Sequence, residues 1–254
     1  MPSRSPRAPL TAYVLHSYAW SESSLILDLF TRDQGRLAVA AKGAKRPYSQ
    51  LRAVLLPFQR IHATLGRVSH DEGASDVQTL RGAEWAGGAA MLTGAALFSG
   101  FYLNELLMKL LARHDPHPAL FDAYAQTLPA FAANDDTLAQ AALRAFELTL
   151  LMEVGVLPDL SVVTLTTQPV VEAQRYTLLP EAGVGAPRQG EPEVAGSVLI
   201  GLQAALEHGS LPALQQACLA ALPELKALLR GLLHYHLGSS VLRTRQVMLQ
   251  LQGL

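Results

Sequence analysis

Cysteine is almost absent from this chain of 254 residues, which contains only Cys218. One thiol cannot form an internal disulfide, and no basic and apolar signal segment opens the sequence. Half of the residues are hydrophobic, which is enough to bury one or two cores of ordinary domain size. We therefore expect a cytoplasmic protein that folds without disulfides.

The motifs of common enzyme classes are also missing. The sequence contains no GxGxxG, no phosphate-binding loop with its lysine, no HExxH and no GxSxG. Zinc is not expected, because there is one cysteine and no histidine between His117 and His208. His234 and His236 are two residues apart, which does not place them on one helical face. We predict no catalytic residue, no cofactor and no metal, and keep an enzyme of unknown class as a third possibility.

One stretch lacks charge altogether, from Trp85 to Asn104, and it reaches the length of a membrane span. It is rich in Gly, Ala, Ser and Thr, which gain little from hydrocarbon, and Glu105 and Lys109 follow closely. We predict a buried helix here and no membrane partner.

Positive and negative charges are distributed unevenly along the chain. Residues 1–81 contain 11 Lys and Arg against 6 Asp and Glu, a net charge of +5. The remainder contains 9 basic and 15 acidic residues, a net charge of −6. The contrast indicates that the first segment faces a polyanion, the alternative being an accidental division of solvated surface charge.

Short alternating segments in the first 81 residues predict five β-strands. They are Tyr13–Ser17, Leu25–Thr31, Arg36–Ala41, Phe58–Leu65 and Asp76–Leu80. In the second segment Leu25, Leu27 and Leu29 share one face, and the turn residues of Arg32–Gly35 connect it to the third as an antiparallel hairpin. Five short strands in about 80 residues fit a closed barrel such as an OB-fold, which we assign to residues 1–81.

From Gly82 onward the periodicity becomes helical. We predict one helix through Leu111, a second over Pro118–Ala132, and a third that begins near Asp135–Thr137 and ends at Gly155. An irregular insertion is expected at about residues 157–192, and helices resume near Ala195 with breaks at Gly209, Pro223 and Gly238. The fold class is therefore α+β, with an OB-fold barrel followed by a helical domain over residues 82–254.

The loop after the third predicted strand is a candidate nucleic-acid site. It combines three cations, which neutralise phosphates, with a tyrosine, which can stack on an unpaired base. These residues are Lys42, Lys45, Arg46 and Tyr48, and Arg36, Arg52 and Arg67 extend the track if the barrel brings them to the same side. The alternative is an ordinary solvated loop.

Arg144 is a candidate partner-binding residue, because its neighbours in the helix are largely apolar. A guanidinium that emerges from an apolar surface suits a peptide that carries a carboxylate and an aromatic side chain. An i, i+3 ion pair between Arg144 and Glu147 explains the same sequence equally well.

Several segments occur together, in order, across most of the chain. They are Val14–Ser17, Trp20–Leu25, Leu27–Thr31, Gly35–Arg36, Ala41–Ala44, Leu56–Phe58, Thr79–Arg81, Ser99–Leu107, Leu143–Leu148 and Leu242–Arg245. In this combination the chain resembles the bacterial RecO family of DNA repair and recombination mediators.

The resemblance implies an OB-fold, a helical domain, binding of single- and double-stranded DNA, and annealing of complementary strands without nucleotide hydrolysis. It implies RecR, the C-terminal tail of the single-stranded DNA-binding protein and, indirectly, RecA as partners, and location at the nucleoid. Arg144 and Phe146 match the family segment associated with that tail. Many relatives carry four zinc-binding cysteines in the insertion, so a zinc-free type is implied here, and Pro47–Tyr48 departs from the small or basic residues usual at that point.

The sequence therefore predicts a mediator that holds single strands on a basic surface, permits their pairing and helps to load a recombinase. An RNA-binding OB-fold adaptor is the alternative, because a barrel of this kind does not itself distinguish the two sugars.

Overall fold

The computed structural model describes residues 8–66, 77–88, 91–133, 135–238, 242–244 and 246–247. The chain forms two compact units, one made of Met1–Thr93 with Gly100–Asp122 and the other of Gly94–Ser99 with Ala123–Leu254. Arg67 and Arg245 are outside the described residues.

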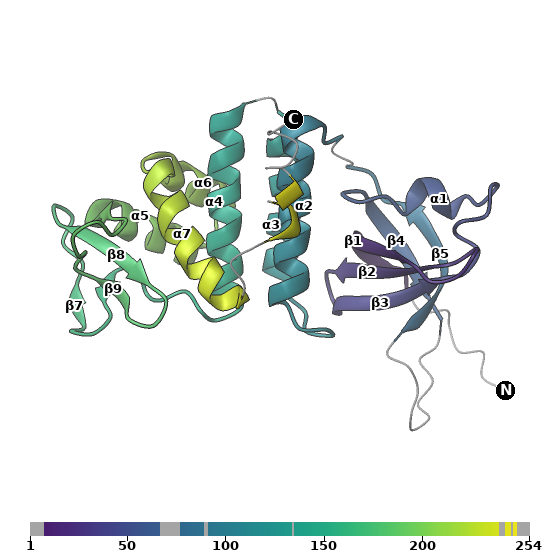
Figure 1. Ribbon diagram of the computed structural model, residues 1–254, viewed down its shortest axis with the longest axis horizontal. Helices are drawn as coiled ribbons and strands as arrows, with labels where there is room; N and C mark the ends of the chain where they lie inside the picture. Colours follow the sequence, from purple (N-terminus) through teal and green to yellow (C-terminus); the bar gives the residue numbers. More distant parts are fainter. Residues whose placement is uncertain are drawn as a thin grey trace, which may run out of the picture. The chain divides into compact units, whose positions relative to one another are not determined.

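The first unit is built on a closed barrel with the strand order β1-β2-β3-β5-β4, the purple and blue strands of Figure 1. The strands are β1 (Leu10–Ala19), β2 (Leu25–Thr31), β3 (Gly35–Ala41), β4 (Arg60–Leu65) and β5 (Gln78–Trp85), with α1 (Leu51–Val54) between β3 and β4. β3 and β5 pair in parallel and close the barrel, whereas the other pairs are antiparallel. The predicted α+β class with an N-terminal OB-type barrel is confirmed.

Alternation along the strands separates an inner from an outer face. Leu27 and Leu29 of β2 point into the barrel core together with Val14, Leu37 and Val39. The intervening residues of β2, among them Phe30, point outward, and Phe30 is nevertheless fully buried. The outer face around Phe30 must therefore also be covered.

The covering segment follows the barrel in the chain and belongs to the same unit. It consists of α2 (Gly94–Leu110) from Gly100 onward and the start of α3 (Pro118–Ala132) up to Asp122. The ring of Phe121 lies 5.3 Å from that of Tyr13 and 5.4 Å from that of Phe30. At Gly35, with φ of 66°, a Cβ atom would lie 2.1 Å from the carbonyl oxygen of Asp115, so only glycine fits beneath this segment.

Two sequence predictions need correction in this region. β5 does not stop near Leu80 but continues to Trp85 through its pairing with β4. The uncharged stretch Trp85–Asn104 is therefore not one buried helix, because it includes the end of β5 and α2 begins only at Gly94. None of the helices in the described ranges is long and apolar enough to cross a membrane.

The second unit is a helical bundle with a small β-rich insertion. Its helices are the remainder of α3, α4 (Asp136–Glu153), α5 (Gly196–His208), α6 (Leu211–Leu219) and α7 (Leu222–Leu237), with α4 packed against α6 and α7. The carboxylate of Asp135 accepts a hydrogen bond from the Leu138 amide at 3.1 Å, which confirms the predicted cap of α4. Gly209 and Gly238 end α5 and α7 in the left-handed conformation, as their predicted role as breaks requires.

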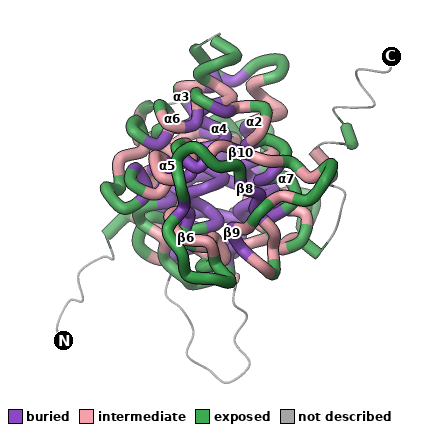
Figure 2. The backbone as a smooth tube through the Cα atoms, turned by 90° about the vertical axis from the view of Figure 1, so that its left-hand side faces the viewer, coloured by how far each residue is buried: buried purple, intermediate pink, exposed green. Residues whose placement is uncertain are grey.

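The insertion contains five short strands. A sheet with the order β10-β8-β9 consists of β8 (Arg175–Leu179), β9 (Gly183–Gly185) and β10 (Val194–Ala195), and β6 (Val162–Val163) pairs with β7 (Gln168–Pro169). The tube at β8 is largely buried in Figure 2, whereas the turn before it, residues 171–174, is exposed. Tyr176 holds the turn before β8, since its hydroxyl accepts from the Val171 amide and donates to Gln174, both at 3.0 Å.

Candidate nucleic-acid interface

The basic loop after β3 is attached to the turn between β1 and β2. The amide of Lys45 donates to the carbonyl oxygen of Ser23 at 3.0 Å, and its ammonium group donates to that of Ser21 at 2.9 Å. The amide of Gly43 lies 3.4 Å from the Ser24 hydroxyl, which accepts a hydrogen bond. These contacts join two loops that are about 20 residues apart in the sequence into one surface, as expected for neighbouring loops of an antiparallel barrel.

The cations of this loop are exposed. Lys42, Arg46 and Arg52 all face solvent, and in the ranges that the structure describes none of the three forms an ion pair. The Tyr48 side chain is 99% exposed. The predicted residues Lys42, Lys45, Arg46 and Tyr48 are thus together on one accessible surface, and Arg52 follows in α1.

Three described carboxylates of this unit pair with arginines outside the basic loop. Asp122 pairs with Arg32 at 2.8 Å, Asp33 lies 3.6 Å from the same guanidinium, and Asp28 pairs with Arg36. The positive charge of the basic loop is therefore left uncompensated by these carboxylates, which favours binding of an anion there.

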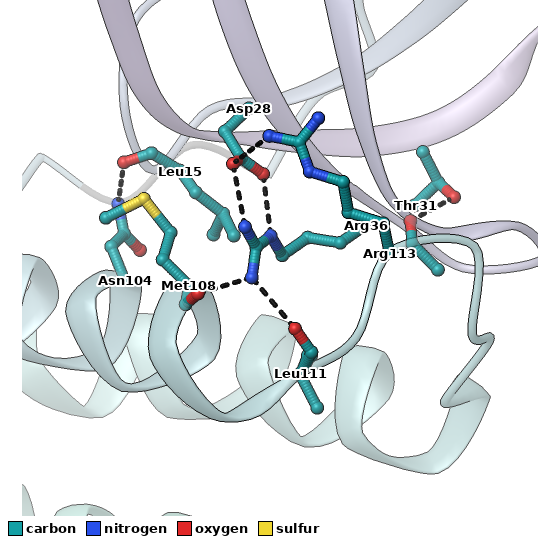
Figure 3. A network of polar contacts seen from close by, with 9 residues as sticks. Leu15, Asp28, Thr31, Arg36, Asn104, Met108, Leu111 and Arg113 are labelled. Atoms are coloured by element: carbon teal, nitrogen blue, oxygen red, sulfur yellow. Dashed lines mark hydrogen bonds and ion pairs between the residues drawn. The ribbon is translucent and has the colours of Figure 1, made fainter. Parts of the chain in front are cut away.

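Arg36 does not belong to this surface, although the sequence analysis included it as an extension of the track. Its guanidinium donates to both oxygens of Asp28, at 3.0 and 3.1 Å, and to the carbonyl oxygens of Leu111 and Met108 (Figure 3). The side chain is only 12% exposed. Arg113 approaches the same carboxylate at 3.7 Å. Arg36 therefore connects β3 to the end of α2 through four hydrogen bonds and is not available for a ligand as the exposed cations are.

Sequence reasoning did not include two residues that the strand pairing brings to this surface. Ala40 of β3 pairs with Thr79 of β5. Two residues after Ala40 comes Lys42, and two residues after Thr79 comes Arg81, whose side chain is exposed. Trp20, at the start of the β1–β2 turn, is 58% exposed. A large aromatic residue in a Ser-rich turn was the signal that could have identified Trp20.

Arg144 and Phe146 lie in the interior of the second unit, so the expectation that the guanidinium emerges at an apolar surface was wrong. The Arg144 side chain is 7% exposed and forms an ion pair with Glu147 at 2.8 Å. Phe146 is fully buried and its ring packs edge-on against that of Tyr124 at 6.2 Å. The structural alternative, an i, i+3 ion pair, explains this segment.

The only cysteine lies near this ion pair. Burial raises the pKa of the Cys218 thiol to about 12, and the neighbouring Arg144 charge offsets only part of this effect. Such a thiol is neither a nucleophile nor a ready metal ligand at neutral pH. Among the described residues no group of three or more His, Cys, Asp and Glu side chains is arranged to hold a metal ion.

Comparison with known proteins gives consistent results over most of the chain. The family model for the recombination protein O N terminal matches residues 8–88, and that for the recombination protein O C terminal matches residues 91–246. The chain is similar to the DNA repair protein RecO of Polaromonas naphthalenivorans (strain CJ2), with 53% identity over 249 residues and 96% of each chain covered. It is also similar to DNA repair protein RecO of Variovorax paradoxus (strain S110), with 51% identity over 253 residues and 96% of each chain covered.

Proposed function

Because the chain belongs to the RecO family, we propose that it acts in DNA repair and recombination by binding DNA on the surface formed by the basic loop and the β1–β2 turn. The observation that carries this proposal is the exposure of Lys42, Arg46 and Arg52 without ion pairs among the described residues. Cations in this state bind phosphates and release the counterions condensed on DNA. Such binding depends on charge and is indifferent to base sequence.

Annealing of complementary strands follows from the same property. Two strands repel each other through their phosphates, and a surface that neutralises part of that charge lowers the cost of bringing them together. No covalent step and no nucleotide hydrolysis is required. The protein would thus mediate pairing without acting as an enzyme.

We propose the same partners for this chain that the family resemblance implies. These are RecR, the C-terminal tail of the single-stranded DNA-binding protein and, indirectly, RecA. Arg144 and Phe146 are not assigned to the tail, because both side chains are buried. The tail would have to bind at another site.

The test is a salt titration of DNA affinity. Replacing Lys42, Arg46 and Arg52 together by alanine should weaken binding to all strand sequences alike. It should also reduce the slope of log affinity against log salt by up to about 2, since each phosphate that is no longer neutralised on a single strand accounts for about 0.7. Lys226→Ala with Arg230→Ala is the matched control, since both side chains are exposed on α7 in the second unit.

An unchanged slope in the triple variant would move the DNA surface elsewhere. RNA strands of equal sequence belong in the same titration, because preference for RNA would favour the adaptor hypothesis. Annealing of complementary strands coated with the single-stranded DNA-binding protein then tests DNA handling and partner recognition together.

A further inference from the structure

We propose that Trp20 and Tyr18 form a stacking platform for unpaired bases next to the basic loop, and that this platform makes the surface prefer single strands to duplex. The inference rests on the proposed function, because it assigns a second kind of contact to the same surface. Phosphate contacts alone do not distinguish paired from unpaired DNA, whereas stacking requires a base that has left its partner.

The strand registers place Tyr18 on the outer face of the barrel, near the strand ends that lead into the basic loop. Tyr18 pairs with Ile26, Ile26 pairs with Ala40, and Ala40 pairs with Thr79, so these four side chains form a row on the outer face. Their outward direction follows from the inward direction of Leu25, Leu27 and Val39.

The next row on the same face contains the groups that meet a nucleic acid. Two residues beyond Tyr18, Ala40 and Thr79 come Trp20, Lys42 and Arg81. Arg81 lies in β5 on the same side as Thr79, whereas Trp20 and Lys42 directly follow the ends of β1 and β3. The amide of Trp20 donates to the carbonyl oxygen of Ser24 at 3.2 Å, which keeps the start of the turn close to β2. The aromatic residues thus lie at the end of β1, and the cations lie at the end of β3 and in β5.

The aromatic residues on the outer face of the barrel divide into a buried pair and an exposed pair. Tyr13 and Phe30 are covered by Phe121 and are 3% and 0% exposed. Tyr18 and Trp20, further along the same face, are 49% and 58% exposed. The segment Gly100–Asp122 thus covers Tyr13 and Phe30, whereas Tyr18 and Trp20 stay exposed beside the basic loop.

The turn that carries Trp20 is held in place before any ligand binds. Lys45 donates to the carbonyl oxygens of Ser21 and Ser23, at 2.9 and 3.0 Å. A platform that is already ordered loses little conformational entropy when a base stacks on it. Glu22 is an exposed carboxylate in this turn, but three cations, Lys42, Lys45 and Arg46, lie in the attached loop.

The second tryptophan is a natural comparison. Trp85 is 61% exposed at the end of β5, where its neighbour Glu84 is also exposed. The nearby Arg60 guanidinium donates to the carbonyl oxygen of Ala86 at 3.2 Å. Trp85 thus equals Trp20 in exposure but is not part of the loop pair that carries Lys42, Lys45 and Arg46.

The experiment measures affinity for a labelled oligodeoxythymidylate of about 20 nucleotides and for a duplex of equal length, at one low salt concentration. Trp20→Ala should weaken binding to the single strand by about 5- to 150-fold, the effect of losing one stacked base, and change duplex affinity by less than about twofold. Trp20→Phe should retain most of the single-strand affinity, because phenylalanine still stacks. Trp85→Ala should leave both affinities unchanged.

Intrinsic fluorescence gives an independent readout on the folded protein, since the chain has two tryptophans. In Trp85→Phe, where Trp20 is the only tryptophan, the single strand should quench the tryptophan emission; in Trp20→Phe it should not. Equal losses for single strand and duplex in Trp20→Ala, or no loss for either, would overturn the platform while leaving the proposed function intact. If the wild-type chain binds neither DNA, the proposed function fails and the platform fails with it.

Discussion

Arg36 offers a sharp test of the structure, because sequence and structure assign it different roles. As a cation on a strand next to the basic loop it resembles a phosphate-binding residue, whereas in the structure it forms four hydrogen bonds inside the first unit. We expect Arg36→Met to destabilise this unit and to leave DNA affinity unchanged in the molecules that remain folded.

The magnitude follows from what the substitution leaves behind. The Asp28 side chain is 4% exposed and, among the described residues, would keep the ion pair with Arg113 at 3.7 Å, while the carbonyl oxygens of Met108 and Leu111 would lose a donor. Removal of one partner from a buried ion pair costs about 3–5 kcal/mol of unfolding free energy. With a urea dependence of about 2 kcal/mol per molar, the midpoint should fall by roughly 2 M.

The assay is urea unfolding followed by tryptophan emission, which reports on the first unit because Trp20 and Trp85 both belong to it. Lys42→Met is the matched control and should change the unfolding free energy by less than about 0.5 kcal/mol, since its side chain is exposed. Arg36→Lys keeps the positive charge but not the planar guanidinium group with its parallel N–H donors. It should therefore lose less stability than Arg36→Met and provide a folded sample for DNA binding. A wild-type midpoint in Arg36→Met, or weaker DNA binding by folded Arg36→Lys than by Lys42→Met, would refute the structural role.

Three further predictions concern the second unit. Arg144→Ala should lower the free energy of unfolding by about 3–5 kcal/mol, measured by far-ultraviolet circular dichroism, because it leaves the buried Glu147 carboxylate without this ion pair; loss of tail-peptide binding at unchanged stability would contradict this. Cys218 should resist a thiol reagent at pH 8 until urea unfolds the chain, because the thiol is buried. Burial also raises the pKa of this thiol from 9.0 to about 12, so between about pH 9 and about pH 12 only the unfolded chain releases the proton. The free energy of unfolding should therefore fall as the pH rises through that range. Rapid labelling of the native protein would show that the thiol is accessible. Elemental analysis should find no stoichiometric zinc, because the insertion has no cysteine; one zinc per chain that resists dialysis would contradict this.

Local patterns were sufficient to predict much of the fold. β2 and α3 have the bounds that the sequence indicated, because the alternation in β2 and the helical periodicity in α3 are strong. Gly35 follows the turn after β2, and Pro118 is the first residue of α3. The end of β5 was missed because Gly82 and the exposed Glu84 interrupt the apolar alternation. Pairing with β4, a contact with a distant part of the sequence, extends the strand to Trp85.

The candidate site could be predicted only in part, for a similar reason. Cations next to Gly and Pro identify the basic loop, but the sequence does not show which cations have partners. Arg36 meets Asp28 on the adjacent strand and carbonyl oxygens more than 70 residues away. Arg144 has its partner Glu147 one helical turn away. The sequence therefore allowed this ion pair as one of two explanations of the segment, beside a partner-binding role.

The cover of the barrel by residues that follow it has a consequence for how the chain folds during synthesis. A ribosome releases the chain from its N-terminus, so all five strands emerge before Gly100–Asp122 does. Until Phe121 has emerged, the rings of Tyr13 and Phe30 lack the partner that covers them, and Arg36 lacks its acceptors on α2. The nascent barrel therefore exposes an apolar outer face for the time needed to translate this segment, and a fragment that ends after β5 would keep that face exposed permanently.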